Sequence, residues 1–382
     1  MAVDLVPTIL YSGMMGVVVM ALIQAFNKTK HKQTSYLSGL LVLLIIHILG
    51  ELYIYSGAYQ YAPGIAGFQF PVRMLLGPAL YFYAYDAMSP DNKLSVKNYL
   101  IALLGPLVVI LAMIPFILSM SAEQKLALAD PATRDPALWQ IAKFTCLFTA
   151  TAFIVFTYSY LFAALKLHSK HRKQLMDKYS AIEKRSMDWF RGILILWGLA
   201  WLIYAVNYAA TFLGIKLFGL GVLLPVFELF ILIAFTHLAL NQSELSKSEK
   251  VNHNQERANS EDVKTRTAVI SPAKMEQIAS KLSLTMTEKE LFKDEDLSLN
   301  SLSNSISVSE NYISETLSQF LNTNFFQFVN NYRVEEAKKL LTSTDMLVST
   351  IAYEVGFKSK STFNSAFKKI VGTTPTAFKK SF

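Results

Sequence analysis

Long apolar stretches alternate with short polar segments over the first 240 residues of the chain. A helix needs about 20 mostly apolar residues to cross the roughly 30 Å hydrocarbon core of a bilayer. Seven stretches meet this requirement, at residues 5–26, 36–56, 66–88, 98–119, 139–165, 191–213 and 217–240. The pattern therefore predicts seven membrane-spanning helices.

The lysines and arginines between these stretches are unevenly distributed. One set of loops carries thirteen of them, namely Lys28, Lys30, Lys32, Lys93, Lys97 and eight within residues 166–191. The opposite set carries three, Lys125, Arg134 and Lys216. Because basic loops stay in the cytoplasm, the N-terminus is expected outside and the C-terminal tail inside.

The density of charged residues changes near Asn241. Residues 1–240 hold 29 charged side chains, whereas residues 241–382 hold 35, which is normal for a soluble domain. Residues 241–270 are polar, of mixed charge and without aromatic residues, so they are expected to be a linker. This linker is either flexible or continues the last span as helix. The expected domains are thus 1–240, 241–270 and 271–382.

The tail shows the apolar spacing of short helices. After a helix expected over about 272–283, apolar residues between Leu297 and Leu317 indicate two short helices that meet at a turn at Ser307. Ser309 is suited to cap the second of them, because its hydroxyl can accept from free backbone N–H groups. This outline is a helix-turn-helix.

The outline recurs about fifty residues later in the chain. Apolar residues from Val348 to Ile370 mark two more helices, and Gly356 stands at the turn between them because glycine readily adopts a positive φ. A single helix from Phe325 to about Thr342 is expected to join the two units. The chain as a whole is therefore predicted to be all-α.

Three sequence stretches carry a resemblance to a known family. They are RVEEAKKLL at 333–341, IAYEVGFKSKSTFNSAFKK at 351–369 and GTTPTAFKK at 372–380. With them, the region from Leu297 to Phe382 resembles the DNA-binding domain of the AraC/XylS family of bacterial transcription regulators. The apolar front resembles, more weakly, the sensory part of membrane-bound members, best at RMLLGPALYFY over 73–83.

The resemblance implies two recognition helices that enter successive major-groove segments of double-stranded promoter DNA. In the first, Ser309 to Leu321, the groove-facing residues are expected to be Asn311, Ser314 and Glu315. In the second, Lys360, Ser361, Asn364 and Ser365 are expected to face bases, while Lys358, Lys368 and Lys369 contact phosphates.

The two helix-turn-helix units differ in charge. Residues 282–324 contain two lysines and seven acidic residues, whereas residues 348–382 contain six lysines and one acidic residue. Many relatives have arginine where this chain has Glu315 and Ser365. We therefore expect the second unit to dominate nonspecific affinity and the first to contribute selectivity or little.

Ionisable and amide side chains inside the expected spans are costly unless paired or functional, and six of them are candidates for a common site. They are His47, Glu51, Arg73, Lys143, Asn207 and Glu228. One interpretation is a polar pocket open to the outside that binds a ligand. The other is a set of buried ion pairs that lock helices together, for instance Arg73 with Glu51 or Glu228.

No catalytic constellation is visible, since HExxH, CxxC, GxSxG and P-loop patterns are missing from the sequence. Neither enzymatic activity nor a cofactor is expected. His47, Glu51 and His237 could form an intramembrane metal site, but their spacing does not support one.

These observations lead to one function and its rivals. The expected function is that of a one-component regulator in the bacterial inner membrane, in which the bundle senses an unknown small-molecule or envelope signal. Its partners would be promoter DNA and the lipid bilayer, with a homodimer and a contact with RNA polymerase as further options. The alternative is a membrane transporter or enzyme with an appended regulatory or tethering domain.

Overall fold

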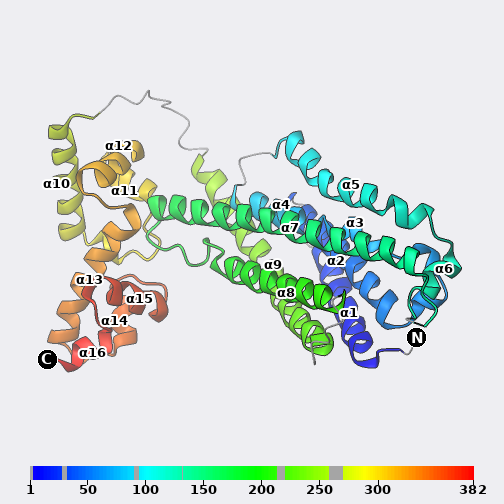
Figure 1. Ribbon diagram of the computed structural model, residues 1–382. Helices are drawn as coiled ribbons and strands as arrows, with labels where there is room; N and C mark the ends of the chain where they lie inside the picture. The colour runs from blue at the N-terminus through cyan, green and yellow to red at the C-terminus, as the bar shows by residue number, and fades with distance from the viewer. Residues whose placement is uncertain (1–2, 28–31, 90–93, 131, 213–219, 258–269) are drawn as a thin grey trace. The chain divides into compact units, whose positions relative to one another are not determined.

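The computed structural model describes residues 3–27, 32–89, 94–130, 132–212, 220–257 and 270–382. The described residues form helices and turns, with an isolated bridge between Tyr179 and Ser298 and no strand, which confirms the all-α prediction (Figure 1). The chain divides into two compact units. One comprises Met1–His168 and Asp188–Asn259 and is called the membrane unit after the spans expected from the sequence; the C-terminal unit comprises Ser169–Met187 and Ser260–Phe382.

Six helices of the described chain are long and apolar enough to cross a membrane. They are α1 (Leu5–Asn27), α2 (Lys32–Tyr55), α5 (Val96–Leu118), α7 (Pro136–Lys178), α8 (Asp188–Phe212) and α9 (Leu220–Arg257). Smaller elements complete this unit, namely η1 (Ala58–Gln60), η2 (Pro63–Ile65), α3 (Gln69–Arg73), α4 (Leu76–Met88) and α6 (Ala122–Ala127). Residue 213 of the sixth expected span and residues 217–219 of the last one lie outside the described residues.

The third expected span, 66–88, is not one continuous helix. It is divided into α3 and α4, and α4 has 13 residues, which rise only about 20 Å. The break has a local cause, because Pro78 has no N–H to donate to Met74 and fits best in the first turn of a new helix. The division leaves Arg73 at the end of α3, where its side chain is buried.

The helix α9 extends beyond the apolar stretch. It continues from the expected span into the interval expected as a linker and ends at Arg257. Residues 258–269 lie outside the described residues. The helical alternative therefore describes residues 241–257.

The C-terminal unit is built from short helices around two apolar cores. Its elements are α10 (Pro272–Glu288), η3 (Leu291–Lys293), α11 (Leu299–Ile306), α12 (Glu310–Glu315), the π-helical stretch η4 (Thr316–Phe320), α13 (Phe325–Ser343), α14 (Val348–Glu354), α15 (Lys360–Val371) and α16 (Pro375–Lys380). The first core is centred on Leu302, Ile313 and Leu317, and the second on Ile351, Phe363 and Phe367. The two helix-turn-helix outlines and the linking helix α13 are confirmed.

Polar residues fix where the helices of this unit begin. The side chains of Ser298, Ser309, Asn324, Ser359 and Thr374 each accept a hydrogen bond from the backbone N–H three residues ahead. Such a cap stabilises a helix by about 1 kcal/mol. The expected cap at Ser309 and the turn at Ser307, which has φ 54°, are both present.

The C-terminal unit also contains residues 169–187, which the sequence placed with the membrane part. Ser180 of this segment donates from its backbone N–H to the carbonyl oxygen of Leu297 at 3.2 Å. Its Oγ is 3.2 Å from Nη2 of Arg333. These hydrogen bonds explain why this segment groups with the tail.

Candidate nucleic-acid interface and intramembrane cluster

The second expected reader helix, α15, has an apolar face and a polar face. Phe363 and Phe367 are fully buried in the second core, so the helix is fixed in its rotation about its axis. The opposite face leaves five of the predicted residues well exposed and a sixth, Asn364, half-buried. The exposed predicted residues on α15 are Lys360, Ser361, Ser365, Lys368 and Lys369. They form a basic and hydroxyl-rich surface suited to phosphates and base edges.

Two lysines near α15 already have protein partners. The Nζ of Lys358 forms an ion pair with the carboxylate of Asp296, so this predicted phosphate contact is neutralised within the unit. The Nζ of Lys379 donates to the carbonyl oxygens of Thr344 and Met346 at 3.0 and 2.7 Å, where it closes the end of α13. Neither contact was visible as a pattern in the sequence, because the partners are distant along the chain.

The first expected reader helix corresponds to α12 and η4. α12 has 6 residues against 12 in α15, and its charged side chains are acidic. Asn311 is exposed on α12, whereas Ser314 and Glu315 are half-buried. The Glu315 carboxylate accepts a hydrogen bond from Nε2 of Gln319 at 3.3 Å. No Lys or Arg occurs in α12 or η4, so the first unit offers a polar surface without a phosphate-binding cation on its reader helix.

Arg333 of α13 joins the two helix-turn-helix units, a role that the sequence did not reveal. Its side chain is 1% exposed, and its Nε and Nη2 donate to the carbonyl oxygens of Phe292 and Asp294, each at 2.7 Å. Its guanidinium carbon lies 5.4 Å from the centre of the Phe357 ring in the second unit. Burial lowers the pKa of Arg333 to about 10, so the group stays charged at neutral pH.

Gly356 packs against the same loop. It has φ 92°, and a Cβ placed there would lie 2.6 Å from the carbonyl oxygen of Phe292 and 2.7 Å from that of Lys293. The turn of the second helix-turn-helix unit therefore touches the η3 loop of the first helix-turn-helix unit through backbone atoms. We call the η3 loop with Leu297, Arg333 and Gly356 the junction.

Replacing Gly356 by alanine is expected to destabilise the C-terminal unit by about 3 kcal/mol or more, because the Cβ meets backbone oxygens and φ is positive. Gly372→Ala is a matched control, since Gly372 has φ 87° but open space around its Cβ position. It should cost only about 1–2 kcal/mol. Pulse proteolysis of the full chain in urea, with detection of a C-terminal tag, measures both; equal losses would contradict the packing argument.

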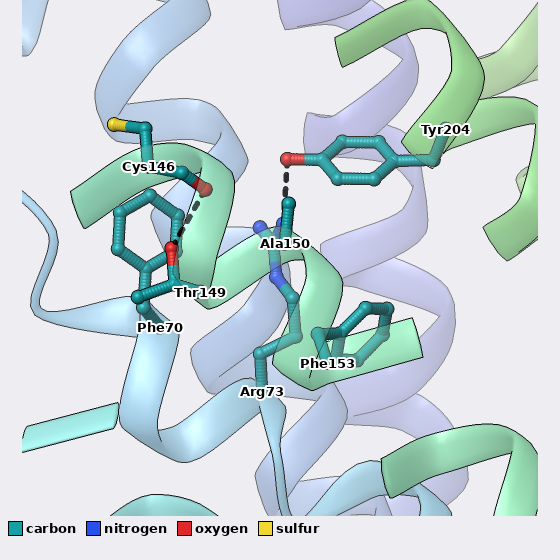
Figure 2. A pocket seen from close by; sticks show the side chains of 7 residues that line it. All are labelled: Phe70, Arg73, Cys146, Thr149, Ala150, Phe153 and Tyr204. Atoms are coloured by element: carbon teal, nitrogen blue, oxygen red, sulfur yellow. Dashed lines mark hydrogen bonds between the residues drawn. The ribbon is translucent and has the colours of Figure 1, made fainter. Parts of the chain in front are cut away.

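In the membrane unit, the structure brings Arg73 and Glu51 together. The guanidinium of Arg73 forms an ion pair with the Glu51 carboxylate, and both side chains are 5% exposed. The Nη1 of Arg73 donates to the hydroxyl of Tyr204 on α8 at 2.7 Å (Figure 2). Sequence reasoning named the ion pair as one interpretation but missed Tyr204, because tyrosine is common in membrane helices.

Glu228 has a different partner. The hydroxyl of Tyr11 on α1 donates to its Oε2 at 2.9 Å, and the Tyr11 ring stacks on Tyr55 with centroids 5.7 Å apart. Glu228 also interacts electrostatically with Glu51 and Arg73. These residues, Tyr11, Glu51, Arg73, Tyr204 and Glu228, are called the intramembrane cluster because they lie within or beside the expected spans. They are drawn from α1, α2, α3, α8 and α9.

The remaining three predicted pocket residues are less closely tied to this cluster. His47 lies one turn before Glu51 on α2, and its Nδ1 is buried without a hydrogen bond to the described residues. Asn207 lies one turn after Tyr204 on α8, and Lys143 is half-buried on α7. Their part in a common site stays a prediction.

One small cavity touches the cluster, and a second cavity shares lining residues with the first. The first, of about 20 Å³, touches Arg73 and Tyr204 and has room for about one water molecule (Figure 2). The second is about 170 Å³, and its lining includes the aromatic residues Tyr53, Tyr59, Phe70 and Phe116. Phe70 and Cys146 line both cavities. The cluster is thus a buried ion pair with a cavity beside it, so both interpretations of the sequence remain.

The ion pair permits a sharp stability test. Glu51→Leu is expected to destabilise the membrane unit by about 3–5 kcal/mol, because Arg73 is left buried without its counter-charge. Glu51→Leu combined with Arg73→Leu should recover most of this loss, since apolar residues can replace a buried pair. Thermal unfolding in detergent can be followed by the reactivity of Cys146, the single cysteine. A double variant as unstable as the single one would contradict this account.

Comparison with known proteins concerns the C-terminal part of the chain. Residues 302–381 match the model of a family described as a helix-turn-helix domain. An HTH-type transcriptional regulator of Staphylococcus aureus is 39% identical over 90 residues, which are 24% of this chain and 12% of that protein. The HTH-type transcriptional regulator YtdP of Bacillus subtilis is 32% identical over 82 residues, 22% of this chain and 11% of that protein.

Solved structures give a further likeness. The C-terminal domain of AraT, a response regulator from Geobacillus stearothermophilus, is 28% identical, covers 30% of this chain and 89% of that chain, and has a TM-score of 0.26. The stretch that matches the Staphylococcus aureus regulators covers about an eighth of the length of those proteins, 12%. Its own two helix-turn-helix outlines, joined by α13, agree with the family match. The C-terminal part of this chain is an AraC-type helix-turn-helix domain.

Proposed function

We propose that the chain is a membrane-embedded one-component transcription regulator that binds promoter DNA and responds to a signal received by its membrane unit. The observation that carries the proposal is the presence, in one chain, of an AraC-type domain and six helices apolar and long enough to span a bilayer. Nucleic acid and lipid would then be the partners of the two units. A homodimer and a contact with RNA polymerase are compatible extensions.

DNA binding in this proposal divides between the two reader helices. The exposed lysines of α15, Lys360, Lys368 and Lys369, would neutralise phosphates, while Ser361, Asn364 and Ser365 would read base edges. The acidic first unit would contribute selectivity through Asn311, Ser314 and Glu315, because a carboxylate accepts from cytosine but repels phosphate. Affinity should therefore depend mainly on α15.

The orientation in the membrane follows from the basic loops. With thirteen lysines and arginines on one side against three on the other, the N-terminus would be outside and the C-terminal unit in the cytoplasm of a bacterial inner membrane. This placement is required by the function, since the domain must reach the chromosome.

The intramembrane cluster is the proposed origin of the response. Glu51 and Arg73 are buried, Glu228 is half-buried, and the three lie on different helices, so a change in their pairing would be linked to a change in helix packing. A ligand shifts such an equilibrium only as far as it prefers one state over the other. A small polar molecule that competes for Arg73 or Glu51 has this property.

Two measurements test the proposal. Chromatin immunoprecipitation with the full chain should recover promoter fragments. A reporter that functions only in the cytoplasm should be active when fused after Phe382, and one that functions only outside should be inactive. Recovery of no reproducible fragment, or a reporter active only outside, would overturn it. Occupancy that ignores every medium component would favour a transporter or enzyme with a DNA tether.

A further inference from the structure

A segment between α7 and α8 completes the C-terminal unit. Residues 169–187 belong to this unit, although the apolar helices on either side of them belong to the other. The segment contains the end of α7, which extends to Lys178, and a turn that leads to Asp188 at the start of α8. The C-terminal unit is therefore connected to the membrane unit through this segment as well as through the chain that follows α9.

Internal contacts give the segment a defined shape. The backbone N–H groups of Arg185 and Ser186 donate to the carbonyl oxygen of Ile182 at 3.0 and 2.8 Å. The Arg185 guanidinium lies 4.1 Å from the centre of the Tyr179 ring. The backbone carbonyl oxygen of Arg185 is 3.2 Å from Nε2 of His171. The segment is thus a folded turn and not an open loop.

The segment binds the junction at Ser180. Both the N–H and the hydroxyl of Ser180 donate to the carbonyl oxygen of Leu297, at 3.2 and 2.7 Å, and Ser180 is 2% exposed. The Nη2 of Arg333 lies 3.2 Å from the Ser180 hydroxyl oxygen. Tyr179 pairs with Ser298 as an antiparallel bridge. The contact therefore combines backbone pairing with a buried, charged hydrogen bond.

The place of this contact within the domain gives it consequences. Ser298 caps α11, the first helix of the first unit, and the neighbouring Asp296 binds Lys358 of the second unit. Arg333 holds the η3 loop on which Gly356 of the second unit packs. The segment thus touches a loop at which the two helix-turn-helix units contact each other.

We propose that residues 179–187 are a docking element that couples the membrane helices α7 and α8 to the junction, and so controls the spacing of the two reader helices. A displacement of α7 against α8 would strain the turn and weaken the contacts of Ser180. Release of Ser180 leaves Arg333 and Leu297 with one hydrogen-bond partner fewer each, so the junction loosens. This inference rests on the proposed function for its output but not for the contact itself.

A reversible cross-link tests the contact. In a Cys146→Ser background, Tyr179→Cys combined with Ser298→Cys places two thiols at a bridge pair, where Cβ atoms are about 4.5–5.5 Å apart. The full chain in inverted membrane vesicles should form this disulfide under mild oxidation. The control pair is Arg172→Cys with Ser298→Cys. Position 172 lies seven residues before position 179, about 10 Å along the helix, so this pair should not form a disulfide. Equal cross-linking of the two pairs overturns the docking contact.

The cross-linked chain also tests the coupling. Binding to a promoter fragment recovered with the full chain is measured before and after reduction of the disulfide, and we expect the affinity to change at least fivefold. A smaller change overturns the coupling while the contact stands. If no fragment is bound by any form of the chain, the proposed function fails, and the cross-linking result still decides the contact.

A second measurement guards against misfolding of the cysteine variants. In the unsubstituted full chain, the Ser180 amide should exchange slowly with deuterium, because it is buried and donates to Leu297. Ser180→Ala keeps the amide but removes the hydroxyl that contacts Leu297 and Arg333, and should speed exchange of this peptide at least tenfold. Fast exchange in the unsubstituted chain, or no effect of the substitution, counts against the docking element.

Discussion

Lys360→Ala combined with Lys368→Ala is expected to weaken DNA binding about tenfold or more near 0.1 M salt, equally for all sequences. Both lysines are exposed on α15, whereas Lys358 is held by Asp296 and Lys379 by carbonyl oxygens. Loss of two phosphate contacts should lower the slope of log affinity against log salt by about two. Fluorescence anisotropy with a promoter fragment and with a random fragment measures both quantities.

The control for this variant removes the same charge elsewhere. Lys289→Ala with Lys339→Ala takes two exposed lysines from the end of α10 and from α13, outside both reader helices. It should leave the salt slope within experimental error. An unchanged slope in the α15 variant, or an equal loss in the control, would refute the assignment of phosphate contacts to α15.

Arg333→Ala is expected to lower the free energy of unfolding of the C-terminal unit by about 3–5 kcal/mol. The substitution leaves the carbonyl oxygens of Phe292 and Asp294 buried without their charged donor and opens a cavity beside Phe357. Both reader helices should become susceptible to protease together, since the junction joins their units. Pulse proteolysis of the full chain in detergent, read with a C-terminal tag, gives the midpoint shift.

Arg333→Lys separates geometry from charge. Lysine keeps the positive charge but cannot donate from Nε and Nη2 to two carbonyl oxygens in the fixed guanidinium geometry. It should recover less than half of the lost stability. A lysine variant as stable as the unsubstituted chain would show that charge alone, and not the planar donor arrangement, holds the junction.

The sequence specified local structure well where periodicity and capping agreed. The Ser309 cap, the turn at Ser307, the turn at Gly356 and the linking helix from Phe325 all appear at the expected positions. These features depend on residues within a few positions of one another. The third expected span is the exception, because hydropathy does not register that Pro78 cannot continue a helix.

Candidate site residues were less completely predictable. The exposed lysines of α15 followed from the family pattern, but the capture of Lys358 by Asp296 required two segments 62 residues apart to meet. Likewise, Glu51 and Arg73 were named from their charge, whereas Tyr11 and Tyr204 became visible only as hydrogen-bond partners. A tyrosine in an apolar helix has no signature that distinguishes a partner from a lipid-facing ring.

The sequence alone determined that this chain has apolar membrane-length helices followed by paired helix-turn-helix units, because hydropathy, periodicity and capping act over short distances. Only the tertiary structure decided that Ser180, between α7 and α8, binds Leu297 and Arg333, and that Arg333 and Gly356 hold the two units at one loop. These contacts join backbone carbonyl groups to distant donors. Every residue has such a carbonyl group, so no pattern of side chains can announce which one is used.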